Sequence, residues 1–258
     1  MNIIYISVLA FTGLFFDDYA VSKGKLIWSD EFNYSGSPDP SRWDYQLGNG
    51  CPELCGWGNQ EIQFYTKELS NVRVSEGKLI IEAHRTDKGW TSARVTSKGK
   101  KSFTYGRVEV RAKLPAGKGT WPALWMLGEN IDRKGWPWCG EIDIMEHVGR
   151  NPGVVQSVIH TKAEHGNTLL KDTIIVSTAT EKFHIYSMNW KKDLIEFAVD
   201  GKKYYTYRPV KMDPEHWPFS EPQYLLMNLA IGGILGGAEI DPELKSAKME
   251  IDYVRVYQ

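Results

Sequence analysis

Three acidic residues lie within six positions of the segment CGEIDIMEH, residues 139–147: Glu141, Asp143 and Glu146. On a β-strand, Glu141 and Asp143 share one face, and the isoleucines between them share the other. A regular strand would place Glu146 on the apolar face, where an unpaired carboxylate is costly to bury. A β-bulge adds one residue to a strand and would return Glu146 to the face of the other acids. The spacing therefore predicts a bulge at or beside Met145.

Three kinds of surface fit this acidic triplet. The first is a solvated strand face, and the second is a metal site, because hard cations collect carboxylates. The third is a glycosidase, in which one carboxylate is the nucleophile or base and another is the acid; a retaining enzyme separates them by about 5 Å. Bulges are frequent beside active sites, and solvation alone gives no reason to break the alternation.

The bulk composition is that of an ordinary globular chain. It has 258 residues, of which 42% are hydrophobic, and a net charge of -1. Near-neutral charge argues against a nucleic-acid partner, which needs a concentrated basic surface. Aromatic residues make up 12% of the chain, with 10 Trp and 13 Tyr, many beside Gly, Pro or Asn. Indoles carried on loops are well suited to stacking on sugar rings.

The amino-terminal segment contains an apolar run from Ile3 to Phe16. The run is too short to span a membrane but fits the apolar region of a signal peptide, although no Lys or Arg precedes it. A buried strand is the alternative. We expect residues 1–22 to be a signal peptide or an amino-terminal extension, and the protein to be secreted, either outside the cell or into a periplasm. Residues 23–258 are expected to form a single domain.

The chain has three cysteines. Cys51 and Cys55 could close a small loop in an exported protein, although their spacing alone does not establish a disulfide. Cys139 is expected to be a small buried apolar residue.

Strand patterns dominate the elements that must position the acids. The expected strands are residues 79–85, 107–114, 154–161, 183–190, 194–199, 224–231 and 249–257. Asp200-Gly201 lies between LIEFAV (194–199) and KKYYTY (202–207) and predicts a tight hairpin. No segment has the period of a long helix, and no repeat or linker divides the chain. This pattern predicts one all-β domain of two packed antiparallel sheets.

The acidic segment resembles the E-x-D-x-x-E signature of glycoside hydrolase family 16, and within it the laminarinases, which are endo-acting β-1,3-glucanases. The resemblance runs from about residue 26 to the end of the chain. It includes WSDEFN (28–33), WGNQEIQFYT (57–66), GTWPALWMLG (119–128), MNLAIGG (227–233) and IDYVRVYQ (251–258). The loop CPELC (51–55) departs from the family's pattern and leaves the local shape of the cleft open.

The resemblance implies a curved antiparallel β-sandwich, or jelly roll, with an open substrate cleft on its concave sheet. It implies retaining endo-hydrolysis of β-1,3-glucosidic bonds in laminarin-type glucans by double displacement. Glu141 would be the nucleophile, Glu146 the general acid/base, and Asp143 would assist the nucleophile. No catalytic cofactor is expected.

Further positions match residues that contact the glucan in this family. They are Asn59, Arg94, Trp121, Trp125, Trp136 and His160, and Trp136 is expected to form one wall of the cleft together with Trp138. Core packing is the alternative for the first two tryptophans, and we favour it more for Trp125 than for Trp121. A purely structural role is the alternative for His160.

The resemblance also implies a structural Ca²⁺ away from the cleft. Its ligands would be the carboxylates of Glu31 and Asp252 and the backbone carbonyl of Gly77. Oxygen ligands from distant segments suit Ca²⁺, and such a link would stabilise the sandwich.

Two rival functions share this fold. One is hydrolysis of another polysaccharide, such as mixed-linkage β-glucan, agar or carrageenan, because a fold does not determine the substrate. The other is non-catalytic binding of β-glucan, which would not require the acids. We expect a polysaccharide substrate, no nucleic-acid or membrane partner, and a monomer.

Overall fold

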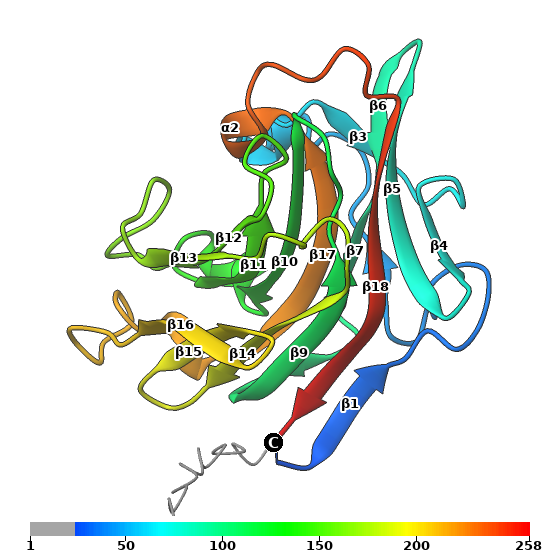
Figure 1. Ribbon diagram of the computed structural model, residues 1–258. Coiled ribbons are helices and arrows are strands. Elements are labelled where there is room, and N and C mark those ends of the chain that lie inside the picture. Colours follow the sequence, from blue (N-terminus) through cyan, green and yellow to red (C-terminus); the bar gives the residue numbers. More distant parts are fainter. Residues whose placement is uncertain (1–23) are drawn as a thin grey trace, which may run out of the picture.

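The computed structural model describes residues 24–258, and nearly all of their regular structure is β-strand (Figure 1). The proposed signal peptide, residues 1–22, lies outside the described residues. The strands are β1 (Leu26–Asp30), β2 (Asp44–Tyr45), β3 (Gln63–Tyr65), β4 (Val72–Ser75), β5 (Lys78–Thr86), β6 (Gly89–Ser92), β7 (Arg94–Thr96), β8 (Ser102–Phe103), β9 (Gly106–Lys113), β10 (Thr120–Gly128), β11 (Glu141–His147), β12 (Val154–His160), β13 (Lys171–Ile175), β14 (His184–Trp190), β15 (Ile195–Val199), β16 (Lys202–Tyr207), β17 (Gln223–Ile231) and β18 (Ser246–Tyr257). Helical turns occur at η1 (Cys55–Gly58), α1 (Ile131–Lys134), η2 (Pro218–Ser220) and α2 (Gly233–Gly236).

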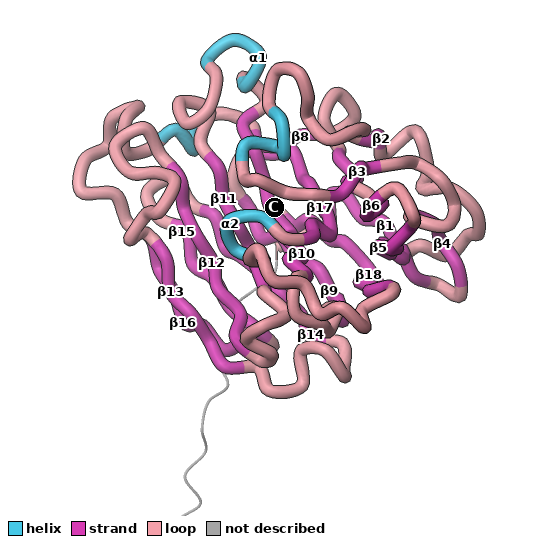
Figure 2. Tube along the Cα trace, turned by 90° about the horizontal axis from the view of Figure 1, so that it is seen from above, coloured by secondary structure: helices cyan, strands magenta, loops and turns pink. Residues whose placement is uncertain are grey.

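The strands form two sheets that pack face to face as a jelly-roll sandwich, which confirms the predicted fold class (Figure 1). One sheet has the order β16-β15-β14-β9-β18-β5-β6-β3, with β1 also paired to β18 and β4 to β5. The other has the order β13-β12-β11-β10-β17-β7-β2, with β8 also paired to β17. All pairs are antiparallel except β3 with β6. Figure 2 shows the strands at the centre of the molecule, with the helical turns and most loops around them.

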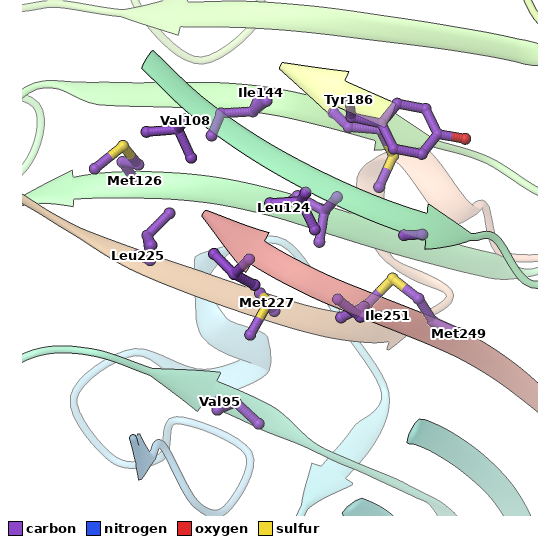
Figure 3. Close-up of a cluster of buried hydrophobic side chains, with 14 of the residues drawn as sticks. Val95, Val108, Leu124, Met126, Ile144, Tyr186, Leu225, Met227, Met249 and Ile251 are labelled. Carbon is purple, nitrogen blue, oxygen red and sulfur yellow. The ribbon is translucent and has the colours of Figure 1, made fainter. Parts of the chain in front are cut away.

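The core lies between the two sheets (Figure 3). Leu124 and Met126 enter it from β10, Ile144 from β11, and Val108 and Met249 from the opposite sheet. Because successive side chains of a strand alternate between faces, these inward positions fix which residues face outward. Glu141 and Asp143 of β11 therefore lie on the outer face of their sheet.

The strands expected from sequence are all present, with small differences at their ends. Asp200 and Gly201 both have positive φ, at 50° and 79°, as the tight turn between β15 and β16 requires. The sequence patterns did not identify β10, because its residues are buried throughout apart from Trp125, which is half-buried, and Pro122 interrupts it. Proline is disfavoured inside a sheet, but Pro122 lies one residue beyond the last pair of the β10–β11 ladder.

Two of the three cysteines form a disulfide, and the third is free. Cys51 and Cys55 form a disulfide in the loop before β3, so the structure selects one of the alternatives left open above. Cys139 is free and fully buried, which confirms its expected packing role. Within residues 24–258, no helix has both the length and the apolar character needed to cross a bilayer.

Candidate active site

The predicted bulge is present, and it lies at Ile144 and Met145 of β11. Between the Asp143 and Glu146 pairs of the β11–β12 ladder, these two residues stand opposite one residue, Ser157. Both side chains enter the core, with exposed fractions of 2% and 0%. Two consecutive core positions shift the alternation by one, so Glu146 returns to the face that carries Asp143. The bulge therefore resolves the conflict that the sequence posed.

Strand register aligns the side chains of the outer face in rows across β17, β10, β11 and β12. Residues paired in an antiparallel ladder lie on the same face of the sheet. The rows are Asn228–Ala123–Glu146–Gln156, Leu226–Trp125–Asp143–Val158 and Tyr224–Leu127–Glu141–His160. Each acid thus belongs to a different row, and each has its own neighbours.

Neutral donors hold the Glu146 carboxylate. The Trp121 indole donates to Oε1 at 2.9 Å, and the Gln156 amide donates to Oε2 at 3.0 Å. Glu146 is 7% exposed. Burial raises the pKa of Glu146, and the hydrogen bonds from Gln156 and Trp121 oppose that rise. This carboxyl group is therefore inclined to hold a proton while its orientation is fixed.

The Glu141 carboxylate has a different set of neighbours. The Trp136 indole donates to Oε2 at 2.8 Å, and His160 Nε2 lies 3.9 Å from Oε1. Burial raises the pKa of Glu141, whereas the charge of His160, the Trp136 hydrogen bond and the charge of Arg94 act in the opposite direction. His160 and Arg94 thus both favour the ionised form of Glu141. At Glu146 the charge of His160 acts in the same direction, but the charge of Glu141 opposes it, and the direct hydrogen bonds come from neutral donors.

Asp143 lies between the two glutamates and beside His160. Its Oδ2 is 3.4 Å from His160 Nε2. Burial, together with the charges of Glu141 and Glu146, raises the pKa of Asp143 well above its usual range. Burial lowers the pKa of His160, but its bond to Asp143 and the charges of the three acids outweigh burial and raise that pKa to about 9. The imidazole is therefore a cation at neutral pH and partly balances the acids.

The metal hypothesis for the triplet can be compared with this geometry. Glu141, Asp143 and His160 each offer a ligand atom, and these atoms lie within 4.8 Å of one another. A metal needs the neutral imidazole, however, and a histidine with a pKa of about 9 holds its proton at pH 7. A metal at this cluster would therefore have to displace the proton of His160, and without one the cluster holds a protonated imidazole beside two acids.

Arg94 lies at one end of the outer face, 5% exposed, in a buried polar cluster. Its guanidinium is 3.3 Å from both carboxylate oxygens of Glu61. It also lies over the rings of Trp57, Tyr65 and Trp125, at 4.4, 4.8 and 5.6 Å from their centroids. This cluster fixes Trp57 and Trp125 next to the acid rows.

The predicted contact residues are distributed around the acids, but one preference is wrong. We favoured core packing for Trp125 over Trp121, whereas Trp121 is the more buried, at 9% exposed, and Trp125 is half-buried on the outer face. Alternation along β10 puts both rings on the acid side of the sheet. Trp121 also lies beside the glycines of α2 and bonds Glu146. Trp136 and Trp138 are 45% and 37% exposed. Asn59 is half-buried and donates to Glu61 at 3.3 Å.

Several residues of the site were not predicted. Gln156 holds Glu146, Asn228 accepts from Trp125 at 2.7 Å, and Glu61 and Tyr65 hold Arg94. Two features of the sequence could have identified some of them. In EIQFY, Glu61 and Tyr65 occupy alternate positions and so share one face of the strand. In VVQSVIHT, Gln156 is four residues before His160, so the two side chains also share a face.

The three expected calcium ligands come from segments that meet along β18. Asp30 pairs with Val254, and Leu79 pairs with Ile251, so Glu31 and Gly77 both lie beside the backbone of Asp252. The carboxylates already have partners. Arg255 donates to Glu31 at 2.9 and 2.7 Å, and Arg111 donates to Asp252 at 2.5 Å. The three segments thus lie near one another along β18, and an ion would have to displace two guanidinium groups from the carboxylates.

Comparison with known proteins agrees with this geometry. The sequence profile of Glycosyl hydrolases family 16 matches residues 56–255. The chain is 49% identical to a beta-glucanase of Rhodothermus marinus, over 91% of this chain and 85% of that protein. It is 39% identical to glucan endo-1,3-beta-glucosidase A1 of Niallia circulans, over 93% of this chain but 39% of that longer protein. The crystal structure of a laminarinase from Flavobacterium sp. UMI-01 superposes with a TM-score of 0.87 at 46% identity, covering 91% of this chain and all (100%) of that one.

Proposed function

The chain belongs to family 16 of the glycosyl hydrolases, and we propose that it cuts internal β-1,3-glucosidic bonds of laminarin-type glucans with retention of configuration. One observation carries the proposal. The bulge at Ile144 and Met145 gathers three carboxylates on one outer face, where the charged groups around each of them differ. The activities named for its relatives, a beta-glucanase and an endo-1,3-beta-glucosidase, support the glucan as substrate.

The mechanism follows from the unlike surroundings of the two glutamates. Glu141, which faces His160 and the charge of Arg94, is the nucleophile and attacks the anomeric carbon as a carboxylate. Glu146, held by neutral donors in a buried place, keeps a proton and gives it to the departing glucosyl oxygen. A glucosyl ester of Glu141 results.

The second half of the reaction reverses the role of Glu146. Now ionised, it takes a proton from water, which attacks the anomeric carbon and releases Glu141. Two inversions leave the configuration unchanged. Asp143 and His160 hold a proton between them beside the nucleophile, so the negative charge near Glu141 stays limited during both steps.

Aromatic side chains supply surfaces for the sugar rings on either side of the acids. Trp125 is half-buried on the outer face, and Trp136 is partly exposed while its indole holds Glu141. Rings held by hydrogen bonds lose little freedom when a sugar stacks on them. We assign Trp121, Trp125 and Trp136 to the glucan-binding surface, together with Asn59, Arg94 and His160.

Parallel product analysis tests the substrate. The protein is expected to convert laminarin into short oligosaccharides whose new reducing ends are first the β-anomer, as seen by NMR in the first minutes. Lichenan, agarose and carrageenan, each assayed alone, should be cut more slowly or remain intact. A Glu146→Gln variant is the control for contaminating activity. Cleavage of agarose, carrageenan or lichenan without cleavage of laminarin would show that the proposed substrate is wrong. Binding of a polysaccharide without cleavage of any would show that the protein is not a hydrolase.

We also propose that Glu31, Gly77 and Asp252 hold a structural Ca²⁺. The ion would neutralise the two carboxylates and tie β1 and the β4–β5 turn to β18, and it takes no part in the chemistry. If free Ca²⁺ is about 100 times its Kd, binding adds about 2.7 kcal/mol of stability. That corresponds to roughly 5–10 °C in melting temperature for a domain of this size.

Calorimetry with and without a chelator measures this effect. Chelation is expected to lower the melting temperature while leaving the initial rate at room temperature unchanged. In the Asp252→Asn variant the chelator should have little further effect. Metal analysis would establish that the chelator has removed the ion. If the melting temperature is then unchanged, the proposed calcium site is wrong.

Export is proposed on two grounds. The apolar run from Ile3 to Phe16 fits a signal peptide. The disulfide between Cys51 and Cys55 is of a kind that persists in oxidising compartments. In addition, a polymeric glucan is a substrate found outside the cell.

We also propose that the protein acts as a monomer, with one copy of the chain sufficient for the reaction.

A further inference from the structure

The backbone of the bulge has a side-chain partner in addition to the strand ladder. The carbonyl of Ile144, inside the bulge, accepts a hydrogen bond from the hydroxyl of Ser157 at 2.8 Å. Ser157 is the single residue of β12 that stands opposite Ile144 and Met145, and it is 0% exposed. Its side chain faces the core. The hydroxyl therefore satisfies a buried carbonyl that the irregular register displaces.

A second hydroxyl extends this contact to the other sheet. Tyr204 of β16 places its oxygen 2.5 Å from the oxygen of Ser157. A serine hydroxyl has one proton, and that of Ser157 points to Ile144, so the tyrosine hydroxyl donates to the serine. Burial raises the pKa of Tyr204, so the phenol remains a neutral donor across the range in which the enzyme works. The chain Tyr204–Ser157–Ile144 thus spans the sandwich.

The neighbouring residue of β12 acts on the opposite face of the same bulge. Gln156 points outward and donates to the carboxylate of Glu146 at 3.0 Å. Consecutive residues of β12 therefore hold the bulge from both sides, one through the side chain of Glu146 and one through the backbone two residues before it. The first contact holds the Glu146 carboxylate directly, and the second holds the backbone that carries it. Both therefore bear on the carboxylate that must meet the glycosidic oxygen.

We propose that Ser157 and Tyr204 are positioning residues for the general acid. They hold the bulge in the conformation that directs Glu146 at the leaving group, without touching the substrate. The inference rests on the role of Glu146 in the proposed function. A displacement of a catalytic group by 1 Å can cost about 10²-fold in rate, so the loss of one hydroxyl inside the bulge should be visible in catalysis.

Two substrates separate positioning of the acid from general damage. Departure of a glucosyl group from laminarin needs the proton of Glu146, whereas departure of a dinitrophenolate from an aryl β-laminaribioside does not. In Ser157→Ala, kcat on laminarin is expected to fall about 10- to 100-fold with little change in KM. The pre-steady-state burst of dinitrophenolate, which reports attack by Glu141, should keep its wild-type rate. Tyr204→Phe should show the same pattern with a smaller loss, and Ser157→Thr should restore the rate on laminarin.

Ser97→Ala is the matched control. Ser97 is also 0% exposed, donates to the carbonyl of Lys101 at 2.7 Å and accepts from the amide of Leu225 at 2.9 Å, but it lies after β7 and outside the bulge. Its loss is expected to lower the melting temperature as Ser157→Ala does, without a selective loss on laminarin.

An equal loss on both substrates in Ser157→Ala, or wild-type kcat on laminarin, would overturn the proposal. If Ser157→Ala does not fold, Tyr204→Phe decides, because it leaves the bond between Ser157 and Ile144 in place. Glu146→Ala is measured in the same two assays. If that variant shows no selective loss on laminarin, the role of Glu146 is wrong, and the failure belongs to the proposed function rather than to the positioning residues.

Discussion

Glu141→Ala and Glu146→Ala, supplied with azide and an activated aryl β-laminaribioside, are expected to release glycosyl azides of opposite configuration. In Glu141→Ala, azide occupies the space of the lost carboxylate and attacks the anomeric carbon once, so the α-azide forms. In Glu146→Ala, the ester on Glu141 still forms because the leaving group needs no proton, and azide then displaces it without a general base. Two inversions give the β-azide.

Rates on laminarin without azide complete this experiment. Loss of the nucleophile should lower kcat by about 10⁴- to 10⁶-fold, as removal of a nucleophile does in other enzymes. Loss of the acid should cost about 10²- to 10⁴-fold. Asp143→Asn is the control, since it should slow the reaction while keeping retention and forming no azide adduct. Anomer assignment by NMR decides the roles: a β-azide from Glu141→Ala with an α-azide from Glu146→Ala would exchange the two residues.

Arg94→Met is expected to be among the most destabilising single changes in the molecule. It would leave the Glu61 carboxylate, 6% exposed, without its cation. Breaking a buried ion pair on one side costs about 3–5 kcal/mol. A loss of that size corresponds to roughly 6–20 °C in melting temperature for a domain of this length. The same change should raise the pKa of Glu141, because the guanidinium charge favours its ionised form.

Chemical unfolding of three variants checks this expectation. The double variant Arg94→Met/Glu61→Gln should recover part of the loss, because a neutral amide can keep the hydrogen bonds from Gln63 and Tyr65. Arg73→Met is the matched control, since its pair with Glu82 is partly exposed and should contribute about 1 kcal/mol or less. A loss for Arg94→Met no larger than that control would show that the cluster does not depend on its ion pair.

The fold and the acids could be predicted from sequence because their signals are local. Alternation revealed β9 and β14, Asp200-Gly201 revealed a hairpin, and the position of Glu146 among apolar residues required a bulge. These inferences depend only on neighbours in the chain. The resemblance of the acidic motif to a known family then supplied the roles.

The remainder of the site depends on contacts between distant segments. The alternation of neither segment reveals the ion pair between Arg94 and Glu61. Asn228 of β17 donates to Tyr65 of β3, a strand of the other sheet, at 3.1 Å. The relative burial of Trp121 and Trp125 was misjudged because both lie on one face, and Trp121 is distinguished by contacts with Glu146 and with α2, which are distant in the chain. The arginine partners of Glu31 and Asp252 were likewise hidden, since each comes from another position or strand.

The place of β18 has a consequence for how the chain is made. This strand is the last one along the chain, yet it lies inside its sheet between β9 and β5 and also pairs with β1. Lys25 and Gln258 exchange backbone hydrogen bonds of 2.7 and 2.9 Å, so the first and last described segments close on each other (Figure 1). During synthesis, β5 and β9 leave the ribosome long before the strand that must separate them. Their unpaired edges then resemble those that make slow-folding β proteins prone to aggregate. A nascent chain stalled before residue 246 would therefore have one nearly complete sheet and one that cannot close.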